Sequence, residues 1–136
     1  MSEASLDMAI VNELIAVRDR AYAPYSKHPV GALVESASGA RFLGANVEVA
    51  HYKGICAEAT ALAGMASAGE RHLRDVYVIG PGEHPCTPCG DCRQRIREFA
   101  TPETRIYVLD ARGRLLKRYT MEELLPDAFG PENLAR

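Results

Sequence analysis

Four cysteines, at positions 56, 86, 89 and 92, are the residues of this chain best suited to chemistry. Cys89 and Cys92 stand three positions apart at the start of a predicted helix, so their thiols face the same way on one helical turn. Cys56 also begins a predicted helix, and the unpaired amides at a helix start favour a thiolate. If the two helix starts meet, three thiols converge on one point.

Three convergent cysteines match a catalytic zinc site, because a structural zinc usually takes four protein ligands. Zinc makes a nucleophile of the water at its open position. Glu58, two residues after Cys56, is placed to take a proton from that water and pass it on. A redox pair, or a structural zinc closed by Cys86 as fourth ligand, are the alternatives. The whole pattern, C-A-E followed by P-C-G-D-C, favours a zinc deaminase of bases and makes Cys86 a loop thiol near the site.

The elements that position these residues alternate between helices and strands. A helix is predicted near the N-terminus, because apolar residues recur there at helical spacing: Leu6, Ile10, Leu14, Val17 and Ala21. Further helices are predicted at 56–68, 89–99 and 121–125, and strands at 30–35, 41–47, 76–79, 106–109 and 114–119. This order predicts a single α/β domain over residues 1–136, with helices packed on the faces of one mixed sheet.

Composition excludes several classes of protein. Sixteen basic and 18 acidic residues leave a net charge of −2, which opposes binding to nucleic acid or to an anionic membrane. The longest weakly polar stretch, 59–69, is too short for a membrane span. The acidic N-terminus lacks a signal pattern, so we expect a cytoplasmic protein whose cysteines are ligands and not disulfides.

Six ordered blocks resemble the cytidine deaminase family, specifically its small homotetrameric type. The blocks are A-P-Y-S-K at 23–27, V-G-A at 30–32, N-V-E at 46–48, C-A-E at 56–58, P-C-G-D-C-R-Q at 88–94 and E-L-L-P-D-A-F at 123–129. The resemblance extends over residues 21–134. It implies a three-layer α/β/α fold with a central mixed five-stranded sheet. It also implies zinc-dependent hydrolysis of cytidine and deoxycytidine, in pyrimidine salvage, to uridine or deoxyuridine and ammonia.

The resemblance implies a role for each matching residue. The zinc ligands would be Cys56, Cys89 and Cys92, with Glu58 as the catalytic proton shuttle. Asn46 and Glu48 match the pair that holds a ribose hydroxyl, and the backbone of Ala57 would bind the base edge. Phe129 matches an aromatic residue that a neighbouring subunit stacks on the base. The implied partners are therefore a small nucleoside and, in a homotetramer, further copies of the chain.

Three departures bear on the substrate. Ala59 stands where the family often has Arg, and Arg93 is a candidate to replace that cation. His28, at the pocket, stands where Phe is common, and the loop between Asn46 and Cys56 is one residue short. The blasticidin S deaminase branch also lacks this Arg and has a still shorter loop, but it lacks the Glu that this chain keeps at Glu48. Together, Ala59, His28 and the short loop would make room for a substituent at N4 of the base. The alternative is therefore a deaminase of N4-substituted cytidine or of a blasticidin-like antibiotic. A non-catalytic structural-zinc protein and a nucleic-acid-editing deaminase are weaker readings, the latter opposed by the net charge.

Overall fold

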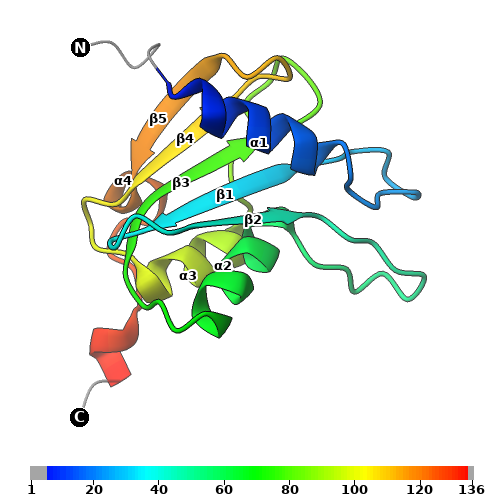
Figure 1. Ribbon diagram of the computed structural model, residues 1–136. Coiled ribbons are helices and arrows are strands. Elements are labelled where there is room, and N and C mark those ends of the chain that lie inside the picture. The colour runs from blue at the N-terminus through cyan, green and yellow to red at the C-terminus, as the bar shows by residue number, and fades with distance from the viewer. Residues whose placement is uncertain (1–5, 135–136) are drawn as a thin grey trace.

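Five strands form one mixed sheet in the order β2-β1-β3-β4-β5, as the computed structural model shows for residues 6–134 (Figure 1). The strands are β1 (Gly31–Ser36), β2 (Arg41–Ala45), β3 (Leu73–Ile79), β4 (Arg105–Leu109) and β5 (Leu115–Thr120). Only β3 and β4 pair in parallel, and the other neighbours are antiparallel. The predicted mixed five-stranded sheet is confirmed.

Helices cover both faces of this sheet and make three layers (Figure 1). Helix α1 (Met8–Arg18) crosses one face, while α2 (Ala57–Ser67) and α3 (Gly90–Phe99) lie side by side on the other. A short helix, α4 (Met121–Leu124), and a 3-10 turn, η1 (Pro131–Leu134), close the chain. No helix within residues 6–134 has the length and apolar character that a membrane crossing requires.

Alternation along the central strands explains the two cores. In β3, Tyr77 and Ile79 pack under α1, and Val76 and Val78 point to the α2 and α3 side. Successive side chains of a strand point to opposite faces, so one strand can serve both layers. Leu14 of α1 is fully buried against the first face. The apolar face that the sequence predicts for this helix is therefore confirmed at Leu14.

Several boundaries differ from the predicted ones for physical reasons. Helix α1 ends at Arg18 and leaves Ala21 in the following turn. Strand β3 begins at Leu73, earlier than the apolar run suggested, because its backbone pairs with β1 as far as Ser36. Asp75 within this extension forms an ion pair with Arg105 of β4 at 3.0 Å. A polar residue can belong to a strand when it has a cross-strand partner. A prediction from hydropathy alone leaves such a residue out and makes the strand too short.

The register of the sheet brings the segments that carry the site motifs to one end of the strands. Gly31 pairs with Ala45 of β2 on one side and with Ile79 of β3 on the other. The segment before Gly31 and the segments after Ala45 and Ile79 therefore leave the sheet at neighbouring points. These segments carry the motifs at 23–30, 46–58 and 86–92. The fold thus gathers three separate motifs at the ends of β1, β2 and β3.

Candidate active site

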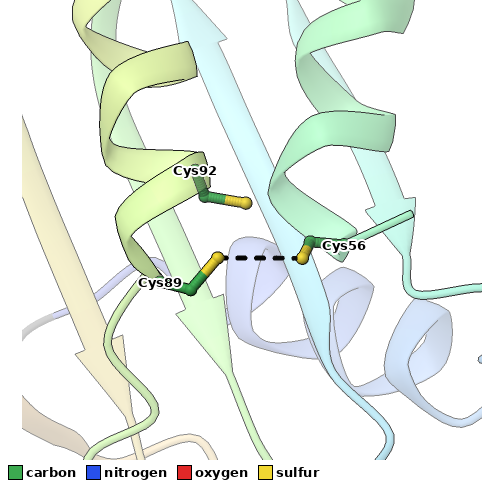
Figure 2. Close-up of side chains that lie close together, drawn as sticks. All are labelled: Cys56, Cys89 and Cys92. Atoms are coloured by element: carbon green, nitrogen blue, oxygen red, sulfur yellow. Dashed lines mark hydrogen bonds between the residues drawn. The ribbon is translucent and has the colours of Figure 1, made fainter. Parts of the chain in front are cut away.

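Three cysteine thiols meet where helices α2 and α3 begin (Figure 2). Cys56 is the N-cap of α2, Cys89 is the N-cap of α3, and Cys92 lies in the first turn of α3. Their sulfur atoms all lie within 4.8 Å of one another, and the Sγ atoms of Cys56 and Cys89 are 3.9 Å apart. Zinc–sulfur bonds of about 2.3 Å at tetrahedral angles would place two sulfurs about 3.8 Å apart. The donor set therefore fits zinc, as the sequence predicted.

Burial affects the protonation of two of these thiols, Cys56 and Cys92. It raises the pKa of Cys56 and of Cys92, and for Cys92 the nearby Glu58 carboxyl raises it further. The helix starts were expected to favour thiolates, but at Cys56 and Cys92 burial and nearby negative charge raise the pKa instead. Metal binding must therefore displace protons, which makes zinc affinity depend on pH.

Glu58 lies beside the cluster in the first turn of α2 and is only 5% exposed. Burial raises the pKa of its carboxyl, and hydrogen bonds from its own amide and from Cys92 partly offset that shift. A carboxyl that keeps its proton to higher pH than usual suits a group that both takes and gives a proton.

A cavity of about 380 Å³ opens next to the cluster. Among the predicted site residues, it is lined by His28, Asn46, Glu48, Cys56, Ala57, Glu58 and Cys89. The rest of its wall is formed by Ser26, Val30, Cys86 and Thr87. Ser26 and Val30 lay in blocks that carry the family resemblance, but Thr87 has no signal in the sequence. Cys92 lies beneath, fully buried.

Asn46 and Glu48 fasten the loop that forms one wall of this cavity. The Asn46 amide accepts from the Val30 N–H at 2.9 Å and donates to the His28 carbonyl at 3.0 Å. Glu48 accepts from the backbone N–H groups of Tyr25 and Ser26, both at 3.0 Å, and from the Ser26 hydroxyl. The Ser26 hydrogen bonds lower the pKa of Glu48, which is therefore ionised at neutral pH. Both side chains have defined partners, unlike residues that merely end an exposed strand.

His28 and Cys86 face each other across the cavity wall, with Nε2 and Sγ 3.8 Å apart. Burial raises the pKa of Cys86 to about 11, so its thiol stays protonated. Cys86 lies outside the cluster of Cys56, Cys89 and Cys92. This agrees with its predicted place as a loop thiol near the site.

Two predicted residues lie away from this cavity. Phe129 is 56% exposed and lines a different hollow beside α3, where its carbonyl accepts from Gln94 at 2.8 Å. Ala59 lines a groove between α2 and α3 and not the cavity beside the thiols, so its small size does not widen that cavity. The idea that Ala59 enlarges the substrate pocket is therefore wrong for this chain.

Arg93 does not direct its guanidinium at the thiols. Its Nε donates to the Pro88 carbonyl at 2.8 Å and its Nη1 to the Leu124 carbonyl at 2.9 Å. These bonds hold the loop before Cys89 against α4. Arg93 is thus neither a solvated surface charge nor a cation bonded to the cluster.

Fold and site together are those of a zinc-dependent deaminase. A family model described as the cytidine and deoxycytidylate deaminase zinc-binding region matches residues 4–108. The chain is 38% identical over 130 residues to a cytidine deaminase of Sporosarcina psychrophila, covering 92% of this chain and 95% of that protein. It is also 38% identical over 127 residues to one from Halalkalibacterium halodurans, with the same shares covered.

Solved structures agree with these sequence matches. The crystal structure of cytidine deaminase from Burkholderia pseudomallei superposes with a TM-score of 0.83 at 36% identity, covering 95% of this chain and all of that one. The enzyme from Mycobacterium tuberculosis gives 0.76 at 30% identity, with 93% and 99% covered. The chain belongs to the cytidine deaminase family.

Proposed function

We propose that this protein hydrolyses cytidine and deoxycytidine to uridine or deoxyuridine and ammonia. The observation that carries the proposal is the buried Glu58 carboxyl, which lies beside the three-thiol cluster and lines the cavity next to it. The same cavity presents to a nucleoside both the thiols of Cys56 and Cys89 and the polar side chains of Asn46 and Glu48. The reaction balances as cytidine plus water giving uridine plus ammonia.

Each residue of the site has a distinct task in this reaction. Held by Cys56, Cys89 and Cys92, zinc would supply a Lewis acid that makes water a nucleophile at neutral pH. Glu58 moves a proton from water to N3 of the cytosine ring, a task that its raised pKa favours. The ionised Glu48 and the Asn46 amide are suited to a sugar hydroxyl, and would discriminate against analogues that lack it.

The first test compares the protein with Glu58→Gln in a steady-state ultraviolet assay on cytidine and deoxycytidine. We expect Glu58→Gln to keep its zinc and to lose about 10²- to 10⁴-fold in rate, which is the usual contribution of a general acid–base. Glu13→Gln is the matched control, because Glu13 lies on α1, on the opposite face of the sheet. A zinc-loaded protein without activity on either nucleoside would contradict the proposal and favour the structural-zinc alternative.

A second candidate substrate class follows from His28. This residue places a polar, exposed imidazole on the cavity wall, next to Cys86. The wall can therefore accept polar substituents, as in an N4-substituted cytidine or a blasticidin-like antibiotic. The same assay with an N4-substituted cytidine decides between this substrate class and the unsubstituted nucleosides. Turnover of that nucleoside alone would replace our proposal, and faster turnover of cytidine supports it.

We further propose that the active protein is a homotetramer in which Phe129 of one chain completes the site of another. Support comes from the exposure of Phe129 and its absence from the cavity of its own chain. Mixing Phe129→Ala with Glu58→Gln tests this, since a hybrid site can take Glu58 from one chain and Phe129 from the other. Recovery of activity on mixing supports a shared site, whereas its absence in exchanging oligomers contradicts it.

We assign the protein to the cytoplasm, where its four unpaired cysteines would stay reduced.

A further inference from the structure

With zinc bound, the metal site would carry negative charge that helix α2 does not balance. A zinc dication bound by three thiolates leaves a net negative cluster, and Glu58 lies beside it. Helix α2 contains no basic residue, and the first turns of α2 and α3 hold the acidic residues Glu58 and Asp91. Partial positive charge at the two helix starts offsets some of this excess. A nearby cation would offset more.

Arg95 is the cation that helix α3 brings to this place. It follows Cys92 by three residues, so the two share one side of α3. Its Nε donates to Asp91 Oδ2 at 3.1 Å, which draws the guanidinium back toward the start of the helix. Asp91 lies between the two ligands Cys89 and Cys92. The positive group is thus held at the end of α3 where the thiols lie.

A groove gives Arg95 access to the other helix as well. Arg95 and Asp91 of α3 line a hollow of about 390 Å³ together with Ala59 of α2. Ala59 follows Glu58 directly, and its methyl group leaves the hollow open. The hydrogen bond to Asp91 raises the pKa of Arg95, and the charges of Cys92 and Cys56 raise it slightly further. Thiolates at Cys92 and Cys56 would therefore act in the same direction as Asp91, which is to keep this guanidinium charged.

We propose that Arg95 is a positioning residue for the metal centre, supplying across the groove the positive charge that α2 lacks and stabilising the thiolates of Cys56 and Cys92. Arg93, the other arginine next to Cys92, is committed to the carbonyls of Pro88 and Leu124. The inference depends on the zinc site of the proposed function. It does not depend on which nucleoside reacts.

The test measures zinc affinity without substrate, by competition with a chromophoric chelator at low and high salt. We expect Arg95→Gln to weaken zinc binding about tenfold at low salt, the low end for groups outside the ligand shell, because Arg95 is exposed. The loss should shrink in high salt, which screens exposed charges. Arg95→Lys and the double variant Ala59→Arg with Arg95→Gln should each restore affinity, since both return a cation to the same groove.

Arg114→Gln is the matched control. Arg114 also bonds an aspartate four residues earlier through its Nε, at 2.9 Å, but lies at the β4–β5 turn. Affinity in Arg95→Gln equal to that of Arg114→Gln would overturn the proposal. A loss that neither salt nor a restored cation reverses would overturn it too, because it would indicate a structural role. Failure of deamination with zinc affinity behaving as expected would instead count against the proposed function alone.

Discussion

Gly44 of β2 is the point where the sheet sets the position of the catalytic helix. A Cβ atom at this residue would lie 2.5 Å from the Ala57 carbonyl oxygen and 2.5 Å from the Ala61 nitrogen. Both atoms belong to the backbone of α2, which cannot rotate away as a side chain can. Ordinary contact begins near 3.4 Å. In Gly44→Ala, helix α2 must therefore move by about 0.9 Å, the difference between 3.4 and 2.5 Å.

This displacement acts on the chemistry because the metal site is divided between two helices. Cys56 and Glu58 move with α2, whereas Cys89 and Cys92 stay with α3. A misplacement of about 1 Å can cost about 100-fold in rate. Overpacking of this kind also destabilises a protein by about 1–3 kcal/mol. We expect Gly44→Ala to lose about 100-fold in kcat, to bind zinc more weakly and to unfold at a lower temperature.

The matched control is Gly64→Ala, on the exposed side of α2. A Cβ there meets nothing within 4 Å, and alanine in place of glycine stabilises a helix interior by about 0.5–1 kcal/mol. The assays are ultraviolet kinetics, zinc competition and thermal unfolding on both variants. A Gly44→Ala protein with full rate, zinc affinity and stability would show that β2 does not position α2 by direct contact.

Three further predictions follow from the site. Because burial raises the pKa of Glu58, folding favours its protonated form, and stability falls as pH rises through that pKa. The metal-free Glu58→Gln protein should therefore melt above the parent at pH 8 and close to it at pH 4, and an equal difference at both pH values would contradict this. The raised pKa values of Cys56 and Cys92 should weaken zinc binding by at least about tenfold per pH unit between pH 8 and 6. Proton release on adding zinc to unbuffered protein checks that expectation, and binding without protons counts against it. Finally, Glu48→Gln should raise KM about tenfold at unchanged zinc affinity, since charge-assisted hydrogen bonds to the 25–26 loop are weakened. Glu70→Gln is the control and should leave KM unchanged. The Glu70 carboxylate also accepts from a serine hydroxyl, that of Ser38, at 3.0 Å.

The local sequence determined the elements and the ligand set. Periodicity located the helices and strands, since a strand or helix with one buried face must repeat its apolar residues at 2.0 or 3.6 positions. The C-A-E and P-C-G-D-C motifs pointed to Cys56, Cys89 and Cys92, and the folded chain brings their three sulfur atoms within 4.8 Å of one another. The edges of the elements were less certain. Asp75 shows why: its place in β3 depends on Arg105, a partner from a distant strand.

Only the tertiary structure decided what surrounds these residues. Ala59 and His28 are both local departures in the sequence, yet packing sends Ala59 to the groove between helices and His28 to the cavity wall. The helix starts favoured thiolates, but the depth of burial, which depends on the whole chain, raises the pKa of Cys56 and Cys92. Burial and distance between remote segments are global properties, because every layer of the fold contributes to them. The sequence therefore specified the chemical groups, and the packing of the three layers set their charge, access and neighbours.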